Sequence, residues 1–331
     1  MSKNIIQNYA IGVDLGGTKV EVAILNAQGQ LVDRLRIPTQ SSRGPDEIIR
    51  KITDTIEQLS AQNPGISSSV VGIGVAGQVE KKTGNIIYAP NLEWRDINLQ
   101  DQLVNRLHKP VFVCNDVKAA TWGEWLYGAG EGCDNLVCIF VGTGIGGAIV
   151  SKGKMLEGCN NTAGEIGHMT IQMHGPVCHC GNKGCFEALA GGWAITRDAQ
   201  LAVQKNKKSG RMLLEIAEGN IDAITGKTVA IAAQKRDPLA SSLIDNVADA
   251  LIAGITSVVN MLGPCRIILG GGVIEGTPLL VERIEAGVKK NALKAATISI
   301  SILPAKLRND SGVIGAAAFA LHQLKNSKYD N

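Results

Sequence analysis

The chain carries one opening pattern twice, and this repeat restricts its fold more than any other feature. Residues 9–25, YAIGVDLGGTKVEVAIL, contain an apolar strand, a glycine turn and a second strand of alternating apolar side chains. Residues 136–150, LVCIFVGTGIGGAIV, follow the same order, and each copy is followed by another glycine turn and more strand-like sequence. The repeat predicts two lobes that begin with the same meander.

Between the two copies, helical and strand-like segments alternate. Residues 45–62, PDEIIRKITDTIEQLSAQ, begin with proline and acids and carry apolar residues at the spacing of an amphipathic helix. Residues 68–77 and 110–116 have the pattern of buried strands, with a helix predicted over 97–108 between them. This alternation predicts an α/β sheet, in which functional groups gather at the carboxyl ends of strands. The residues at such ends are Asp14, Gly77, Asn115 and Asp116.

The second lobe is predicted to continue with helices and two further strands. The predicted elements are helices over 188–260, a strand over 265–273, a helix near 279–290 and a strand over 298–305. The alanine-rich stretch SGVIGAAAFALHQL near the end is predicted to be a helix that returns to the first lobe. The predicted lobes are therefore residues 1–117 with 312–331, and residues 118–311. No low-complexity linker separates them, so we expect them to hinge about a shared cleft.

The composition is that of a globular protein and excludes several function classes. The chain has 331 residues, 45% hydrophobic side chains and a formal net charge of +3. Its basic residues are scattered, which argues against a nucleic-acid-binding surface. The N-terminal stretch MSKNIIQNYAIGVD has no long apolar run and no cleavage site, so we expect no signal peptide, no membrane span and a cytoplasmic protein. Cytoplasmic thiols stay reduced, so clustered cysteines favour metal ligation over disulfides.

The first glycine turn fits the binding of phosphate. DLGGTK, residues 14–19, places an acid, two glycines, a hydroxyl and a lysine in one turn. Backbone N–H groups freed by glycine can approach phosphate closely, Lys19 adds charge, and an acid near phosphate implies Mg2+. A plain tight hairpin explains the same residues without a ligand, and the turn alone leaves both readings open.

Two other motifs resemble nucleotide-binding signatures but have the wrong context. GTGIGG at 142–147 matches GxGxxG, yet strand-like sequence follows where a dinucleotide site requires a helix. TGKT at 225–228 ends like a Walker A loop, but Ile221 stands where that loop requires glycine. A third run, LGGGV at 269–273, would bring a strand end close to a flat ligand such as adenine. A phosphate donor held between the lobes would use all three glycine runs.

Asp116 follows an apolar strand and precedes the predicted helix VKAATWGEWLYG. One role for it is a helix cap, worth about 1 kcal/mol. The other is a general base, because phosphoryl transfer to an alcohol needs positioning, charge stabilisation and one carboxylate to accept the hydroxyl proton. The residues around it allow both roles.

The segment GEIGHMTIQMHGPVCHCGNKGCFE, residues 164–187, is the strongest candidate for a metal site. His168, Cys178, Cys180 and Cys185 are sufficient for a closed tetrahedral Cys3His site. His174 and His179 are alternative fourth ligands. We favour His168, because His179 lies between two ligating cysteines and would point away, and His174 lies in a predicted loop.

The residues around this segment indicate what the metal is for. FEALAGGWAI, which follows, is apolar and neutral, whereas a DNA-binding finger carries basic residues on its helix. The alternative interpretation of the three cysteines is that they are free, buried and bind no metal. Glu165 and Glu187 flank the cluster, and a metal would fix both carboxylates in space. Vicinal hydroxyls of a sugar are natural partners for such acids, so we expect the metal to shape a pocket.

In order along the chain, DLGGTK, the strand-end ND, GTGIGG, EIGH, CHCGNKGCFE and LGGGV resemble the ROK family of bacterial sugar kinases and sugar-responsive repressors. The resemblance spans residues 9–320, and EIGH followed by CxCGxxGCxE is its most specific part. It implies an actin-like ATPase fold of the hexokinase type, an α/β architecture of two lobes with a duplicated βββαβα core. It also implies structural zinc on His168, Cys178, Cys180 and Cys185.

The same resemblance implies roles for individual residues. Asp116 would be the general base. The residues expected to hold sugar hydroxyls are Gly77, Asn91, Asn115, Asp116, Glu165, His168 and Glu187. Those expected at the nucleotide and its Mg2+ are Asp14, Gly16, Gly17, Thr18, Lys19, Gly142, Thr143, Gly144, Gly271 and Gly272.

The activity implied by the resemblance is that of an ATP-dependent hexose kinase, most similar to the glucokinase branch and forming glucose 6-phosphate. N-acetylglucosamine, N-acetylmannosamine and fructose are alternative substrates, and polyphosphate is an alternative donor. A non-catalytic sugar-sensing regulator and a zinc-dependent interaction module are the alternative classes. The family also suggests a homodimer, and its repressors carry an N-terminal helix-turn-helix for which we expect no room before Asp14.

Two positions depart from the family pattern. Lys118 stands two residues after the expected base, where a small or amide side chain is usual. The run AGGWAI, residues 190–195, replaces a more usual ASG run and is expected to alter the wall near Glu187.

Overall fold

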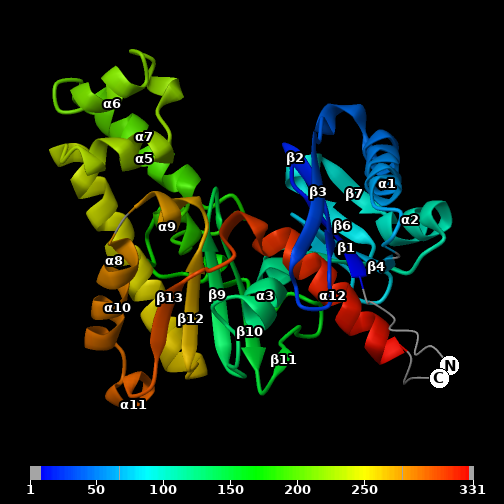
Figure 1. Cartoon of the computed structure of the whole chain (residues 1–331). Helices are drawn as coiled ribbons and strands as arrows, with labels where there is room; N and C mark the ends of the chain where they lie inside the picture. The colour runs from blue at the N-terminus through cyan, green and yellow to red at the C-terminus, as the bar shows by residue number, and fades with distance from the viewer. Residues whose placement is uncertain (1–8, 67, 278, 328–331) are drawn as a thin grey trace. The chain divides into compact units, whose positions relative to one another are not determined.

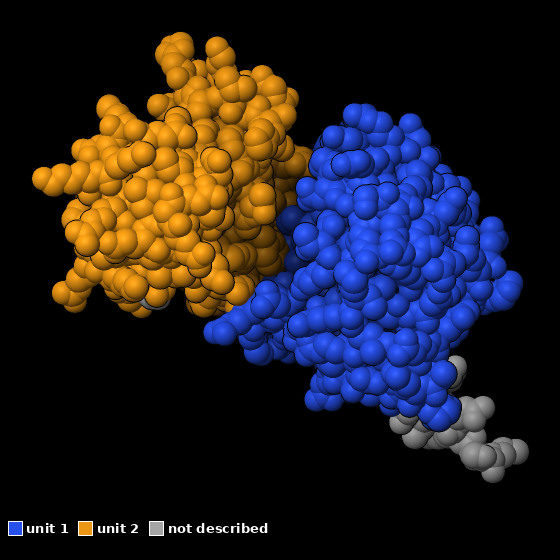
Figure 2. Space-filling model, turned by 90° about the horizontal axis from the view of Figure 1, so that it is seen from above, with its two compact units in different colours: residues 1–132, 157–163, 306–331 blue, residues 133–156, 164–305 orange. Residues whose placement is uncertain are grey.

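The computed structural model describes residues 9–66, 68–277 and 279–327 (Figure 1). The chain divides into two compact units, which Figure 2 distinguishes by colour. Unit 1 comprises residues 1–132, 157–163 and 306–331, and unit 2 comprises residues 133–156 and 164–305. Residues 118–132, 157–163 and 306–311 thus group with unit 1, whereas the predicted lobes placed them in the second lobe.

The core of unit 1 is a five-stranded mixed sheet with the order β3-β2-β1-β4-β8. Its strands are β1 (Tyr9–Leu15), β2 (Lys19–Leu25), β3 (Leu31–Pro38), β4 (Ser68–Val75) and β8 (Val111–Asn115). The first three strands pair antiparallel, while β4 runs parallel to β1 and β8 runs parallel to β4. The carboxyl ends of β1, β4 and β8 therefore lie at one edge of the sheet.

Unit 2 contains a sheet of the same design, with the order β11-β10-β9-β12-β13. Its strands are β9 (Leu136–Val141), β10 (Ile145–Ser151), β11 (Lys154–Met155), β12 (Arg266–Gly270) and β13 (Ser301–Pro304). Here too, three antiparallel strands are followed by two parallel ones. The duplication that the repeat predicts is confirmed, because strand order and direction both recur.

Two amphipathic helices, α1 (Pro45–Gln62) and α2 (Leu99–Leu107), cover one face of the unit 1 sheet. The predicted bounds of α1 are confirmed, since Pro45 opens it and acids occupy its first turn beside the positive end of the helix dipole. Ile11 and Val13 of β1 lie in the same buried cluster as Ile52 and Leu59 of α1. Alternate β1 residues therefore face these helices, as the period of a strand requires.

The opposite face of that sheet is covered by α3 (Asp116–Tyr127) and α12 (Ser311–Ser327), which lie side by side (Figure 1). α12 packs unusually close to the sheet: a Cβ atom at Gly12 would lie 1.9 Å from the carbonyl oxygen of Val313. Glycine in the strand and alanine in the helix allow this approach, which explains the composition of the C-terminal stretch.

A small antiparallel sheet in unit 1 lies outside the sequence predictions. It has the order β5-β6-β7 and consists of β5 (Gln78–Val79), β6 (Ile86–Ala89) and β7 (Trp94–Ile97). The short 3-10 turn Pro90–Leu92 connects its last two strands. Gly77 precedes this sheet and Asn91 lies in its connecting turn, so the sheet positions two of the predicted sugar-binding residues.

Helices surround the unit 2 sheet largely as predicted. They are α4 (Glu187–Ala190), α5 (Gly192–Lys205), α6 (Arg211–Ile216), α7 (Gly226–Gln234), α8 (Pro238–Leu262), α9 (Gly272–Gly276), α10 (Leu280–Asn291) and α11 (Lys294–Thr297). The strand predicted over 265–273 is too long: β12 ends at Gly270, because Gly271 adopts a positive φ of 91° and α9 begins at Gly272.

Among the described residues, α8 alone is long and apolar enough to meet the length and composition of a membrane span. Its side chains Val247, Leu251, Ile255 and Val258 are buried in the core of unit 2. The helix packs on α7 and α10, beside which it runs in Figure 1. The core helix of a soluble protein passes the same test, so this one helix does not indicate a membrane protein.

Candidate functional site

The first predicted phosphate turn joins β1 to β2 and is rigidly held. The N–H group of Gly16 donates to the carbonyl oxygen of Lys19 at 3.0 Å, and Oγ1 of Thr39 donates to the carbonyl oxygen of Gly16 at 2.7 Å. Gly17 lies against the backbone of Asn91, where any side chain would be within 2.9 Å of its carbonyl oxygen. The turn, its lysine and Asn91 therefore form one neighbourhood in unit 1.

Asp14, the next-to-last residue of β1, has an unusual electrostatic environment. Burial, followed by the charge of Asp116, raises the pKa of its carboxyl from 3.8 to about 6, although nearby Lys19 opposes the shift. Asp14 also lies against the first turn of α12, where a Cβ atom at Gly312 would be 3.0 Å from Cγ of Asp14. An acid in such a position is stabilised by a bound cation, because a positive charge offsets the cost of its ionisation.

Asn115 and Asp116 mark the junction between β8 and α3. Asn115 is the N-cap: its Oδ1 accepts from the N–H groups of Val117 and Lys118, at 3.0 and 3.2 Å. Its Nδ2 donates to the carbonyl oxygen of Gly77 at 3.1 Å and to Oδ1 of Asp116 at 3.0 Å. The same Oδ1 of Asp116 accepts from the Val117 N–H group at 2.9 Å. Asn115 therefore caps the helix, and Asp116 has one carboxylate oxygen anchored at its start.

Lys118, which departs from the family pattern, is buried and holds a neighbouring loop. Its ammonium group donates to the carbonyl oxygen of Asn161 at 2.7 Å and to the side-chain oxygen of the same residue. Nδ2 of Asn161 in turn donates to the carbonyl oxygen of Val79 at 2.9 Å. Residues 157–163 are thus fastened to unit 1, although the chain on either side of them belongs to unit 2.

The second predicted phosphate turn, in unit 2, is built on the start of α5. Gly142 donates its N–H group to the carbonyl oxygen of Gly144 at 3.0 Å, which closes the turn. Gly192 and Trp193 donate their N–H groups to the carbonyl oxygens of Gly142 and Thr143, both at 2.9 Å. Backbone hydrogen bonds therefore fix the turn from the helix side.

Glu187, at the start of α4, is held at both carboxylate oxygens. Oε2 accepts from the N–H group of Ile145 at 2.8 Å, and Oε1 accepts from Nε1 of Trp193 at 3.1 Å. A Cβ atom at Gly144 would lie 2.2 Å from Oε2, so the GTG turn must have glycine there to admit the carboxylate. The predicted sugar-binding acid and the predicted phosphate turn are therefore neighbours in unit 2.

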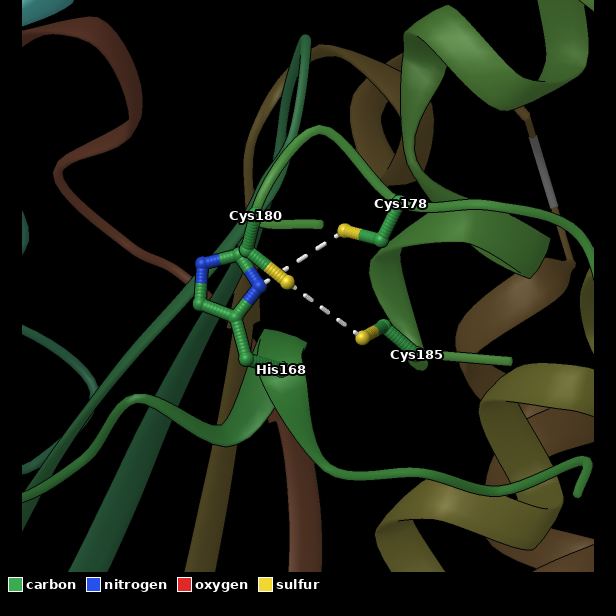
Figure 3. A group of neighbouring side chains, drawn as sticks. All are labelled: His168, Cys178, Cys180 and Cys185. Atoms are coloured by element: carbon green, nitrogen blue, oxygen red, sulfur yellow. Dashed lines mark hydrogen bonds between the residues drawn. The ribbon is translucent and has the colours of Figure 1, made fainter. Parts of the chain in front are cut away.

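The four predicted metal ligands come together in unit 2. His168, Cys178, Cys180 and Cys185 point toward a common centre, and their ligand atoms all lie within 4.8 Å of one another (Figure 3). Sγ of Cys178 is 3.8 Å from Nδ1 of His168, and Sγ of Cys180 is 3.7 Å from Sγ of Cys185. A tetrahedral zinc with Zn–S bonds of about 2.3 Å separates two sulfurs by about 3.8 Å, whereas a disulfide requires about 2.05 Å. The spacing therefore fits a shared zinc ion.

The chemistry of these ligands also suits a divalent cation. Burial raises the pKa of the Cys185 thiol to about 12, and burial likewise raises the pKa of Cys178. A hydrogen bond from the Asn182 backbone lowers the pKa of Cys180. A bound dication would compensate for the burial of thiolates, with release of protons on binding.

The other histidines of the segment lie outside this group. His179, although between two of the cysteines, stacks on the ring of Trp193 with centroids 4.1 Å apart. His174 is exposed. Glu165 is exposed as well and directly precedes the 3-10 turn Ile166–His168, which ends at a member of the metal group.

Two side-chain pairs that organise the site are not apparent from the sequence. Lys118 and Asn161 are 43 residues apart, and Trp193 reaches Glu187 from the following helix. The only signals were departures from the family pattern at Lys118 and in the AGGWAI run, which marked the positions without identifying their partners.

Both units contain a five-stranded sheet of the same topology, with a glycine turn between its first two strands. Unit 1 carries an aspartate at a strand end, and unit 2 carries the Cys3His group. This duplicated architecture is the actin-like fold of the hexokinase type. A family model described as the ROK family matches residues 10–323, so the chain belongs to the ROK family.

Individual relatives agree with this assignment. The chain is 37% identical to a glucokinase of Halalkalibacterium halodurans over 322 residues, with 96% of each chain covered. The crystal structure of a ROK family glucokinase from Streptomyces griseus in complex with glucose and AMPPNP superimposes with a TM-score of 0.80 at 32% identity, covering 95% of this chain and all of the other. A xylose repressor of Caldicellulosiruptor bescii is 27% identical over 316 residues, which are 95% of this chain and 78% of the repressor.

Proposed function

We propose that the protein is an ATP-dependent hexose kinase that phosphorylates the 6-hydroxyl of glucose, with Asp116 as general base. The observation that carries the proposal is the position of Asp116, at the end of β8, with one carboxylate oxygen anchored by Val117 and Asn115. A positioned carboxylate is what phosphoryl transfer to an alcohol requires of the protein, in addition to charge stabilisation. Similarity to glucokinases supports the substrate and the donor.

In this proposal Asn115 orients the base. Its amide already makes four hydrogen bonds within the protein, which is the full capacity of the side chain. A sugar hydroxyl would bind Asn115 only by replacing one of them. The main contribution of Asn115 is therefore to hold Asp116 in one orientation, with Gly77 completing the arrangement.

The glycine turns and Asp14 would serve the nucleotide. Backbone N–H groups at Gly17 and Thr18, with the charge of Lys19, suit phosphate oxygens, and those at Thr143 and Gly144 are the corresponding groups in unit 2. Magnesium bound with the nucleotide would supply positive charge at the transferred phosphate, and Asp14 would hold it directly or through water. The raised pKa of Asp14 fits such a cation site. Gly271 and Gly272 would approach the nucleoside.

The unit 2 acids would hold the sugar, and the metal group would hold the acids. Zinc on His168, Cys178, Cys180 and Cys185 would fix the segment between Glu165 and Glu187, so that both carboxylates keep their positions. Nδ1 of His168 faces Cys178, which leaves Nε2 as the ring nitrogen for a sugar hydroxyl. We further propose that the protein is cytoplasmic and forms a homodimer.

The test is a panel of hexoses in which ATP consumption is coupled to phosphorylation of each sugar. We expect turnover with glucose and much weaker turnover with N-acetylglucosamine, N-acetylmannosamine and fructose. Asp116→Asn, which keeps the shape of the side chain, should bind glucose yet turn over at least about 100-fold more slowly.

Each outcome of this panel separates two readings. Comparable rates for wild type and Asp116→Asn would remove Asp116 as the base. Glucose binding by wild type without ATP consumption would instead indicate a sugar-sensing regulator, the role that the names of the repressor relatives suggest. Binding of neither sugar nor nucleotide would leave only a zinc-dependent interaction module.

A further inference from the structure

Trp193 occupies an unusual position between three parts of the candidate site. It lies in the first turn of α5, and its backbone N–H group donates to Thr143 of the GTG turn. Its indole Nε1 donates to Oε1 of Glu187, and its ring stacks on His179 of the cysteine loop at an interplanar angle of 22°. The guanidinium of Arg197 lies over the ring, with Cζ 5.1 Å from the ring centroid.

This environment fixes the orientation of the indole. His179 and Arg197 both contact the ring, and Arg197 is itself held by a hydrogen bond of 3.0 Å to the carbonyl oxygen of Ala188. Trp193 also packs against the buried cluster of Cys178, Cys185 and Ala188. A ring held by several partners presents its single N–H donor in one direction, and that direction is toward Glu187.

The hydrogen bonds of Glu187 limit what it can bind. An ionised carboxylate has about four lone-pair positions. The Ile145 N–H group uses one on Oε2, and the Trp193 indole uses one on Oε1. Each oxygen therefore retains one acceptor position. A carboxylate with one acceptor position left on each oxygen matches a pair of neighbouring hydroxyl donors rather than one donor and one acceptor.

We infer that Trp193 is a positioning residue for sugar recognition, which orients Glu187 so that its two oxygens accept from adjacent hydroxyls of the hexose. The inference rests on the proposed function, since it assigns Glu187 to the sugar. Under this inference, the residue that departs from the family pattern in the AGGWAI run contributes to the choice of sugar. Sugars that replace one of the two hydroxyls by hydrogen or by a larger group lose one of the two hydrogen bonds.

The direct test is Trp193→Phe, which keeps an aromatic ring for His179 and removes the N–H donor. Hydrogen bonds to charged groups suggest that KM for glucose rises about tenfold, with little change in kcat. Selectivity for glucose over its monodeoxy analogues should fall, because a loosely held carboxylate discriminates less. Trp125→Phe, a change of the same kind in the half-buried Trp125 of α3, serves as the matched control and should leave sugar affinity unchanged.

A double-mutant cycle with Glu187→Gln separates positioning from packing. The side-chain amide that Glu187→Gln introduces must turn its NH2 group toward either Ile145 or Trp193, both of which are donors. In the Trp193→Phe background, the NH2 group can face the ring without conflict. The factor by which Glu187→Gln weakens glucose binding should therefore be about tenfold smaller in the Trp193→Phe background than in wild type. A packing role for Trp193 predicts the same factor in both backgrounds.

Glucose affinity by calorimetry without nucleotide, zinc content and thermal unfolding complete the test. An unchanged KM with additive effects, in an active enzyme, would overturn the inference and leave the kinase proposal intact. Weaker glucose binding by Trp193→Phe in a protein that never consumes ATP would support the inference and remove the kinase. If Trp193→Phe loses zinc or unfolds at a lower temperature, the coupling energy of the double-mutant cycle distinguishes the two roles. Additive effects on glucose binding then assign Trp193 to packing and contradict the inference. Failure of wild type to bind any hexose would remove both.

Discussion

The two units share one sheet and differ in the residues that end its strands. In unit 1 the next-to-last residue of β1 is Asp14, and β8 leads into Asn115 and Asp116. In unit 2 the next-to-last residue of β9 is Phe140, and β12 leads into glycines. Unit 2 instead carries its acids beside a Cys3His group, in the long segment between β11 and α5. The same scaffold thus carries acidic side chains at strand ends in unit 1 and a long loop with a Cys3His group in unit 2.

The scaffold and the chemical groups are therefore separable. Sheet order and direction are retained in both units, because they depend on apolar residues at alternate positions. The chemical groups occur where strands stop and loops begin, and there the two copies share only their glycine turns. A variant that changes one unit alone therefore tests whether the two units have different roles.

Loss of the metal should have the largest effect, and it should be confined to unit 2. Structural zinc sites contribute on the order of 10 kcal/mol to the folding of the residues that they bind. Cys185→Ser should therefore lose one equivalent of zinc and the order of residues 166–187, while β1 to β4 retain their protection. Elemental analysis with hydrogen exchange measures both. Retention of one tightly bound zinc with unchanged exchange would show that the four ligands do not form the site.

Gly12→Ala should test the packing of α12, which is particular to unit 1. The new methyl group would meet the carbonyl oxygen of Val313, so we expect a loss of about 3 kcal/mol or more in the free energy of unfolding. The matched change in unit 2 is Cys138→Ala, at the corresponding position of β9, which removes one buried atom and should cost about 1 kcal/mol. Equal losses in urea denaturation would contradict the contrast.

Asp14→Asn should trade stability against turnover. The pKa of Asp14 is raised from 3.8 to about 6 in the folded protein, so the folded state binds the proton more tightly than the unfolded state. The contribution of this group to the free energy of unfolding is therefore fully present below pH 4 and is lost as the pH rises through 6. Above pH 6 the loss amounts to about 3 kcal/mol at most.

The asparagine variant has no such ionisation. Without nucleotide and Mg2+, it should unfold at a higher temperature than wild type at pH 8 and at a similar temperature near pH 4, yet it should be nearly inactive. Calorimetry across this pH range measures the difference. A gain of the same size at both pH values would show that ionisation of Asp14 is not its source.

The smallest effect is expected at the loop that Lys118 holds. Lys118→Met removes the donor to Asn161 and should destabilise unit 1 by about 1–3 kcal/mol, because the partly buried carbonyl group of Asn161 loses its partner. Lys118→Gln, which keeps an N–H donor, should recover part of that loss. Hydrogen exchange of residues 157–163 locates the change, and equal exchange in both variants would mean that Lys118 does not hold the loop.

Much of the scaffold could be predicted from sequence, for physical reasons that are clear at α1. Its apolar residues recur at the helical period, and Pro45 and the first-turn acids mark its start. The Cys3His group could be predicted as well, because its ligands are close in sequence and share one chemistry. The sheet β5-β6-β7 could not, since strands of two to four residues are too short to show a period.

The side-chain pairs of the site could not be predicted at all. The contact between Lys118 and Asn161 depends on how residues 157–163 leave unit 2, and no local pattern encodes that path. The hydrogen bond from Trp193 to Glu187 depends on the angle at which α5 meets α4. The raised pKa of Asp14 depends on burial by α12, which is about 300 residues away in the chain.

We propose that unit 1 supplies the catalytic base and that unit 2 holds the sugar. The most direct test is the rate of phosphoryl transfer to glucose by Asp116→Asn and Glu187→Gln, measured as glucose is raised to saturation. We expect Glu187→Gln to approach the wild-type rate at high glucose, because it lacks only part of the sugar affinity. Asp116→Asn should remain at least about 100-fold slower at every glucose concentration, because it lacks the base. Recovery of Asp116→Asn at high glucose, or failure of Glu187→Gln to recover, would contradict the assignment of chemistry to unit 1 and sugar binding to unit 2.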